Sequence, residues 1–333
     1  MSVYSIHPIT LGDVRTYPLA SRKSKVTVAD FAKAIPRQAS SVKLLDSLPD
    51  ILAGKDFREL CSRVHLARKR GKPVLWGIGG HVIKVGLAPI LIELMHAGLV
   101  SGIAMNGAAL IHDFEIALAG KTSEDVEAGI GKGQFGMAVE TANGINEIAK
   151  LAHRIRIGYG EAAGQYMTSG ILKLRHPEKS VLVAAYQKRI PVTVHLAIGT
   201  DIPHMHPAAD GAALGAASHL DFRLFCSLVE QMNGGVYLNW GSAVLLPEIF
   251  LKAVSVVRNL GVPLNAITTA NFDFIQHYRP VTNVVKRPTA ASNEQGAGSS
   301  RGFAITGHHE IMMPLLAAAL LAGWPGKGRR PTR

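Results

Sequence analysis

Two consecutive strand, turn and helix units lie between Val74 and Gly120, and they constrain the fold more than any other part of the sequence. Each unit begins with an apolar strand-like run that breaks at a glycine-rich turn and continues with helical spacing. In an open parallel sheet such turns lie at the carboxyl ends of the strands, where ligands bind. Exposed amides at helix starts favour anionic groups, such as the phosphates of a dinucleotide. The segment therefore predicts a nucleotide-type pocket.

Three further strands are predicted downstream, at Val192–Ala197, Gly235–Leu238 and Ala266–Ala270. Each is followed by polar turn residues and then by a helical pattern. This alternation is typical of a parallel sheet with crossover helices. The expected fold class is therefore α/β, with a Rossmann-like, doubly wound, mostly parallel sheet and helices on both faces.

The chain is expected to consist of an arm, one domain and a tail. Residues 1–40 are mixed and rich in turn formers, which indicates an N-terminal arm. Residues 41–323 hold all the predicted strands and form a single domain. Residues 324–333 are basic, and we expect a disordered tail there. Within the domain, Asn283–Gly302 is small, polar and glycine-rich, so it is predicted to be a mobile loop.

The net positive charge of the chain raises the hypothesis of a nucleic-acid partner. Lys and Arg number 36 against 24 Asp and Glu, a formal net charge of +12. The basic residues cluster in part near both ends of the chain, as solvated faces and tails do, and no basic motif with interleaved aromatic residues supports nucleic-acid binding. The composition therefore does not favour a nucleic-acid partner.

The expected location is the cytoplasm, with no membrane partner. No apolar run reaches the roughly 20 residues that span a bilayer, and the N-terminus lacks a secretory pattern. The two cysteines, Cys61 and Cys226, lie far apart and form no metal-type spacing. A reduced compartment is the simplest interpretation.

The first glycine-rich turn, GIGGHVIKVG, begins at Gly77 and supplies glycines for close approach to phosphate. It departs from the dinucleotide fingerprint at the third glycine position, where Val82 stands. A strand-to-helix turn of this kind is also common without any ligand.

The second turn contains Asn106 and Gly107, followed by His112, Asp113 and Glu115. His112 falls within the first turns of the predicted helix, close to the strand ends. Imidazole accepts and donates protons near neutral pH, so His112 is a candidate general acid and base, with Asp113 as its orienting partner. The alternative is that these residues cap the helix and have structural roles.

The third cluster, AIGTDIPHMHPAADG, places Thr200, Asp201, His204 and His206 directly after a strand. Alternating histidines near carboxylates can ligate a divalent cation, but this spacing fixes no third ligand. No metal site is therefore assigned. Further polar residues follow later strands in NWGSAV and TGHHE, which contain Gly241, Ser242, His308, His309 and Glu310. Because the ends of parallel strands meet at one edge, we expect one shared pocket.

Taken together, these motifs resemble the deoxyhypusine synthase family, in its divergent bacterial synthase-like branch. The resemblance runs from about Tyr17 to Ala322 and is carried by several segments. These are TYPLASRKSKV, LWGIGGHVIKVGLAPILIELM, AMNGAALIHDFEIALAG, IPVTVHLAIGTDIPHMHP, GGVYLNWGSAVLLPEIFLKA, HYRPVTNVVKRP and TGHHEIMMPLL.

The resemblance implies an NAD-binding domain, a homotetramer built as a dimer of dimers, and transfer of an aminobutyl group from a polyamine through an imine on a lysine. Carried over by position, the NAD contacts fall on Gly79, Gly80, His81, Asn106, Gly107, Thr200, Asp201, Gly241, Ser242, Thr282 and Asn283.

The chain also departs from the family pattern. Ile111 and His112 stand where true synthases have paired glutamates, and the motif ending in Ser-Trp-Gly-Lys is missing. Lys286 is the nearest lysine to replace it, and a solvent-exposed loop lysine is the alternative interpretation. Standard hypusine formation is therefore not expected.

Three hypotheses follow. The first is an NAD-dependent transferase of the deoxyhypusine or homospermidine synthase type that acts on an amine or related small substrate. Its catalytic residues would be His112, Asp113, His309, Glu310 and Lys286. The second is a metal-dependent hydrolase or lyase that uses the histidine-rich strand ends. The third is a non-catalytic scaffold that senses a ligand or binds RNA or protein.

Overall fold

Six parallel strands form one sheet in the order β3-β2-β1-β4-β5-β6. The computed structural model describes residues 3–294 and 300–325. Strand β1 lies in the middle of the sheet, and β2 and β3 follow it towards one edge. The chain then crosses to the other side of β1, where β4, β5 and β6 follow one another, so the strand order reverses between β1 and β4. This arrangement confirms the predicted α/β, doubly wound fold class. The strands are β1 (Val74–Ile78), β2 (Gly102–Asn106), β3 (Val192–His195), β4 (Val236–Trp240), β5 (Thr268–Asp273) and β6 (Arg301–Thr306).

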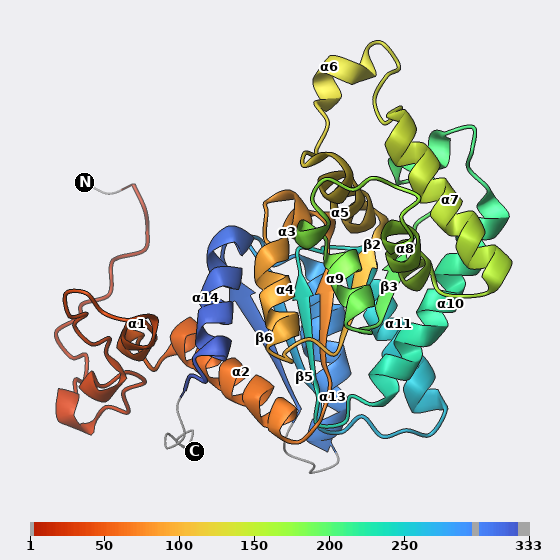
Figure 1. The fold of residues 1–333 in the computed structure, drawn as a ribbon. Helices are drawn as coiled ribbons and strands as arrows, with labels where there is room; N and C mark the ends of the chain where they lie inside the picture. The colour runs from red at the N-terminus through yellow and green to blue at the C-terminus, as the bar shows by residue number, and fades with distance from the viewer. Residues whose placement is uncertain (1–2, 295–299, 326–333) are drawn as a thin grey trace.

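Helices cover both faces of the sheet (Figure 1). One face packs against α2 (Leu52–Lys69), α3 (Gly80–Lys84), α4 (Ala88–His96), α5 (Gly107–Ala119) and α14 (His309–Leu321). The other packs against α10 (Gly211–Glu230), α11 (Leu245–Asn259) and a π-helix (Val281–Lys286) that continues into α13 (Arg287–Glu294). Helices α7 (Val139–Ile155) and α8 (Tyr159–Thr168) lie towards the β3 edge, and α9 (Val181–Gln187) lies beside α4. The short helices are α1 (Ser41–Ser47), α6 (Val126–Ile130) and α12 (Tyr278–Pro280).

Strands β1 and β5 are buried along their whole length, as expected for a sheet covered on both faces. Large aromatic rings from neighbouring strands stack on one another between the sheet and its helices. Trp240 of β4 stacks on Phe272 of β5 with ring centroids 4.0 Å apart, and on Trp76 of β1 at 5.9 Å. These rings fix the end of β4 directly before Gly241, where the chain leaves the sheet.

The prediction of a mobile loop over Asn283–Gly302 is wrong for most of its length. The chain is helical through residues 281–294, and β6 begins at Arg301, while residues 295–299 lie outside the described residues. Val284 is fully buried against the α10 and α11 face, which holds this small, polar segment in helical form. Strand β6 alternates buried Phe303 and Ile305 with exposed neighbours, as an edge strand does.

The two ends of the chain differ from the central domain. Residues 3–40 are almost entirely exposed, and they stand apart from the sheet in Figure 1. Trp324 is buried: its ring lies 6.2 Å from Phe57, its Nε1 donates to Asp46, and the Arg58 guanidinium covers it at 4.5 Å. The predicted tail therefore does not include Trp324, and residues 326–333 lie outside the described residues. No helix in the described ranges is both long and apolar enough to cross a membrane.

Asp113 has a structural role that supports a stability prediction. Its side chain is fully buried, and its carboxylate accepts from Ser180 Oγ (2.5 Å), Val181 N (2.7 Å) and Leu182 N (3.1 Å) at the start of α9. Because Asp113→Ala leaves these donors without an acceptor, we expect it to lower the free energy of unfolding by about 3 kcal/mol. Urea unfolding measures the change. Glu93→Ala, at an exposed position on α4, is the matched control, and equal losses would contradict the assigned role.

Candidate functional site

The glycines of the first turn hold strands and helices close together. Gly79 N donates to Trp240 O at 2.8 Å, and a Cβ at Gly79 would collide with the carbonyl oxygen of Gly241. A Cβ at Gly80 would lie 2.9 Å from Ala108 Cβ and 3.2 Å from His112 Cδ2. The space beside each glycine is therefore filled by protein, and the amide of Gly79 is used within the sheet.

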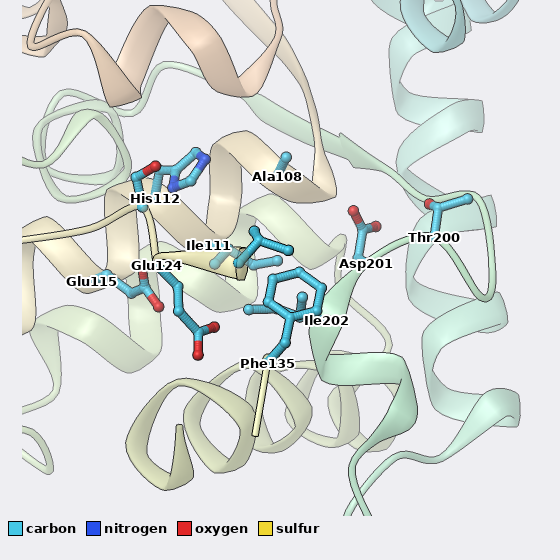
Figure 2. Close-up of a pocket in the computed structure, with 11 residues that line it drawn as sticks. Ala108, Ile111, His112, Glu115, Glu124, Phe135, Thr200, Asp201 and Ile202 are labelled. Carbon is cyan, nitrogen blue, oxygen red and sulfur yellow. The ribbon is translucent and has the colours of Figure 1, made fainter. Parts of the chain in front are cut away.

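A cavity of about 230 Å³ lies beside this turn, at the carboxyl ends of β2 and β3. It lies between α5, the residues that follow β3, and the segment that follows α5 (Figure 2). In this view His112 and Asp201 stand on opposite sides of the lining, with Ala108 and Phe135 between them. The lining residues are Ala108, Ile111, His112, Glu115, Ser123, Glu124, Val126, Phe135, Thr200, Asp201 and Ile202.

A chain of hydrogen bonds orients the imidazole of His112. Thr122 Oγ donates to Glu115 Oε2 at 2.5 Å, and Thr141 Oγ donates to Glu115 Oε1 at 2.9 Å. Thr122 Oγ lies 2.7 Å from His112 Nδ1. Because the threonine proton is directed at the carboxylate, the hydroxyl oxygen accepts from His112 Nδ1–H. This assigns the Nδ1–H tautomer and leaves the lone pair on Nε2.

The surroundings of His112 favour the neutral ring. Burial lowers the pKa of His112, the carboxylate of Glu115 raises it to a smaller extent, and the ammonium of Lys84 lowers it further. The net shift is downward from an ordinary value near 6.5. At neutral pH the ring is therefore unprotonated, and Nε2 is available as a base.

Asp201 is the second titratable group that the surroundings perturb. Burial raises its pKa to about 6, and it forms no ion pair within the described part of the chain. Its carboxylate lies against Gly107 at the start of α5, where a Cβ would collide with it. The glycine at position 107 is thus required for the carboxylate to reach the cavity.

The cavity is lined by acids without balancing cations. Glu115, Glu124 and Asp201 line it, and neither lysine nor arginine is among the lining residues. Glu115 and Glu124 already accept hydrogen bonds, from the two threonines and from Gly136 N (2.8 Å) respectively. Asp201 forms a capping box with His204 in the turn after β3, and no cation pairs with its carboxylate among the described residues. An ionised carboxylate in a partly buried site favours a cationic partner.

The other predicted catalytic residues lie outside this cavity. Asp113 follows His112 directly but points to α9, so Thr122 and Glu115 orient the ring instead. His309 is buried, and its Nε2 donates to Phe272 O at 3.1 Å. Glu310 is exposed on α14, and Lys286 is exposed on the π-helix. Of the predicted residues, His112, Thr200 and Asp201 line this cavity and His309 does not, so this cavity brings together only part of the predicted set.

Several predicted cofactor contacts have local structural roles. Asn106 Oδ1 accepts from Ala109 N at 3.0 Å and caps α5, while Ser242 Oγ accepts from Leu246 N at 3.1 Å at the start of α11. Asn283 lies in the π-helix with Thr282, and its side chain bridges Glu248 and Arg287. Thr200 and Asp201 line the cavity, and His81 packs beside His309 with ring centroids 5.3 Å apart.

The NAD that the sequence resemblance implies does not fit the described cavity. Pockets for drug-sized ligands begin at roughly 300 Å³, and the cavity holds about 230 Å³. Protein atoms also fill the space beside Gly79 and Gly80, where a pyrophosphate would have to approach the backbone. The cavity suits a small molecule, and no chemical step is derived through the dinucleotide.

The histidines after β3 stabilise a turn. His204 Nδ1 accepts from Gly199 N at 3.1 Å, and His206 Nδ1 accepts from Ala208 N at 3.2 Å. Within the described ranges, no three His, Cys, Asp or Glu side chains come together as metal ligands. The proposed metal-dependent hydrolase therefore has no ligand set among these residues.

A second cavity, of about 720 Å³, lies at the amino end of β3 between α8, α9 and α10. Its lining includes Glu161, Tyr186, Arg189 and Val192, but no histidine and none of the predicted site residues. The chemistry-bearing residues therefore point to the smaller cavity.

Comparison with known proteins does not identify a family. No family model matches the sequence, and no curated protein matches it. Solved structures with similar folds include a conserved putative LOR/SDH protein from Methanococcus maripaludis S2. It has 17% identity and a TM-score of 0.48, and the alignment covers 82% of this chain and 71% of that chain.

Two further structures show the same level of similarity. AgrE, solved with ornithine and NAD+, has 17% identity and a TM-score of 0.49, with 81% of this chain and 33% of that chain covered. A putative deoxyhypusine synthase from Entamoeba histolytica has 11% identity and a TM-score of 0.48, with 87% and 96% covered. The chain thus spans about a third of AgrE. Similarity this low assigns neither family nor activity, and the resemblance seen in the sequence stays a prediction.

The close approach of Asp201 to Gly107 supports a paired test. Gly107→Ala places a methyl group where the carboxylate lies, so we expect a loss of about 1–3 kcal/mol in unfolding free energy and a displaced Asp201. Gly215→Ala on α10 meets no atom within 4 Å and is expected to stabilise the helix by about 0.5–1 kcal/mol. Thermal unfolding of both variants measures the difference. A neutral Gly107→Ala would contradict the close packing.

Proposed function

We propose that this protein is an enzyme that binds a small amine in the cavity at the carboxyl ends of β2 and β3 and transfers a proton at His112. The observation that carries the proposal is the placement of a hydrogen-bonded, neutral imidazole opposite a half-buried carboxylate that has no cationic partner among the described residues. Acid and base partners typically have pKa values that their surroundings shift in opposite directions. The first sequence hypothesis, an enzyme acting on an amine, is kept in this form.

Each residue has a defined part in the proposed chemistry. Asp201 binds the ammonium group of the substrate, and Glu124 adds negative charge to the same lining. His112 Nε2 accepts a proton from the other end of the substrate, which must be long enough to reach across the cavity. The imidazolium formed is stabilised through Thr122 by the Glu115 carboxylate.

Calorimetric titration with 1,4-diaminobutane tests the substrate class. We expect wild-type protein to bind the diamine and to bind the uncharged 1,4-butanediol far more weakly. Asp201→Asn should weaken diamine binding by about 10- to 100-fold, the effect of losing one charged partner of a hydrogen bond. Glu127→Gln on exposed α6 is the matched control. Equal affinity for diamine and diol would overturn the proposal.

Binding should also depend on pH in a defined direction. The pKa of Asp201 is about 6 in the free protein, and a bound cation favours the ionised form and lowers that pKa. Diamine affinity should therefore be constant well above pH 6 and fall by up to about tenfold per pH unit below it. Protonation of His112 below its own lowered pKa adds repulsion. Titrations in buffers of different ionisation enthalpy should show proton release near pH 6, and Asp201→Asn should remove it.

An NAD-dependent transferase is the second candidate function, and the strand order favours it. The order β3-β2-β1-β4-β5-β6 is the one that dinucleotide-binding sheets use, with the ligand at the reversal between β1 and β4. Here Gly79 and Gly241 are in contact at that point, so NAD binding requires this contact to open. Titration with NAD+, with and without the diamine, separates the two candidates. Binding of the diamine alone supports the first, and NAD+ binding supports the second.

A further inference from the structure

The segment that follows α5 forms one wall of the cavity. We call residues 121–137 the cover segment; it contains α6 and contributes Ser123, Glu124, Val126 and Phe135 to the lining. Most of its residues are exposed, and Figure 1 shows α6 projecting beyond the sheet edge at which α3 and α5 begin. The cover segment thus packs against the domain mainly near its two ends.

Each end of the cover segment has its own attachment. At the far end, Gly136 has a φ of +77° and packs directly against Ile202 and Met205. Glu124 Oε2 accepts from Gly136 N at 2.8 Å, which ties the segment to itself rather than to the domain. At the near end, Thr122 Oγ is held by His112 and Glu115 of α5. Thr122 is therefore the polar attachment of the cover segment to the site.

We propose that Thr122 is a positioning residue that makes proton acceptance by His112 depend on closure of the cover segment. One hydroxyl serves both tasks, because it accepts from His112 Nδ1 and donates to Glu115. If the cover segment moves away, His112 loses the acceptor that selects its tautomer, and Glu115 loses its link to the ring. Glu124 and Phe135, which line the cavity from the cover segment, move away with it. This inference rests on the proposed function and adds its regulation.

The charged groups around His112 come from four parts of the fold. Glu115 lies on the same helix, and Lys84 comes from α3. Glu124 lines the cavity from the cover segment, and Asp201 lines it from the residues after β3. Only Glu124 is carried by the cover segment. Its departure removes one negative charge from the cavity lining and reduces the burial that lowers the pKa of His112.

Two substitutions at position 122 test the coupling without any turnover measurement. Thr122→Val keeps the shape but removes the hydroxyl, and Thr122→Ser keeps the hydroxyl. Hydrogen–deuterium exchange of residues 121–137 should become roughly three- to tenfold faster in Thr122→Val, the effect of losing a hydrogen bond. Exchange in Thr122→Ser should stay close to wild type. Thr141→Val is the matched control, because Thr141 also donates to Glu115 but lies on α7, outside the cover segment.

Nitrogen-15 NMR of the imidazole gives the second measurement, with His112→Gln used to assign the signal. We expect Thr122→Val to mix the two tautomers of His112, because the hydroxyl that accepts from Nδ1 is lost. Thr122→Ser should preserve the Nδ1–H tautomer. Unchanged exchange and an unchanged tautomer in Thr122→Val would overturn the coupling, even if diamine binding is confirmed. Loss of diamine discrimination in wild-type protein would instead overturn the proposed function.

Discussion

Burial of the parallel sheet on both faces confines polar chemistry to the ends of its strands. Strands β1 and β5 expose none of their residues, and rings such as Trp240 and Phe272 fill the space between helices and sheet. An unpaired polar group inside these layers would cost several kcal/mol, on the order of 2–7. The loops at the carboxyl edge are therefore where a titratable side chain can face a ligand, and the cavity that contains His112 lies there.

Hydrogen-bond partners distinguish the carboxylates that stabilise the fold from the carboxylate that lines the cavity. Asp113 and Asp221 are both fully buried, and each accepts from backbone amides that begin a helix: Asp113 at α9 and Asp221 at Gly160 of α8. Burial raises the pKa of both, while these hydrogen bonds lower it. At Asp201 burial is the sole cause of the shift. No hydrogen bond lowers the pKa of Asp201 as it does for Asp113 and Asp221. A cationic ligand can stabilise the ionised carboxylate instead.

Five of the six strands were predictable because mainly apolar or β-branched residues precede a polar turn and a helical pattern. Strand β6 was not, because only Phe303 and Ile305 face the core and the residues before them are small and polar. At the site, the strand-end rule correctly grouped His112 with Asp201. It failed for Asp113, because adjacent residues on a helix point in different directions, whereas Glu115 is three positions from His112 and shares its side. Thr122 could not be found in this way, because no periodicity places a loop hydroxyl beside a ring ten residues away.

His112 and His309 illustrate why two imidazoles that follow strands of one sheet need not share a role. Each ring has one nitrogen engaged: Nδ1 of His112 with Thr122 and Nε2 of His309 with the carbonyl oxygen of Phe272. The carbonyl belongs to β5 and is fixed by the sheet, and His309 is 1% exposed among Phe274, Trp240 and His81. His112 faces a cavity, and its hydroxyl partner is backed by a carboxylate, so its ring can gain and lose a proton while the sheet stays intact.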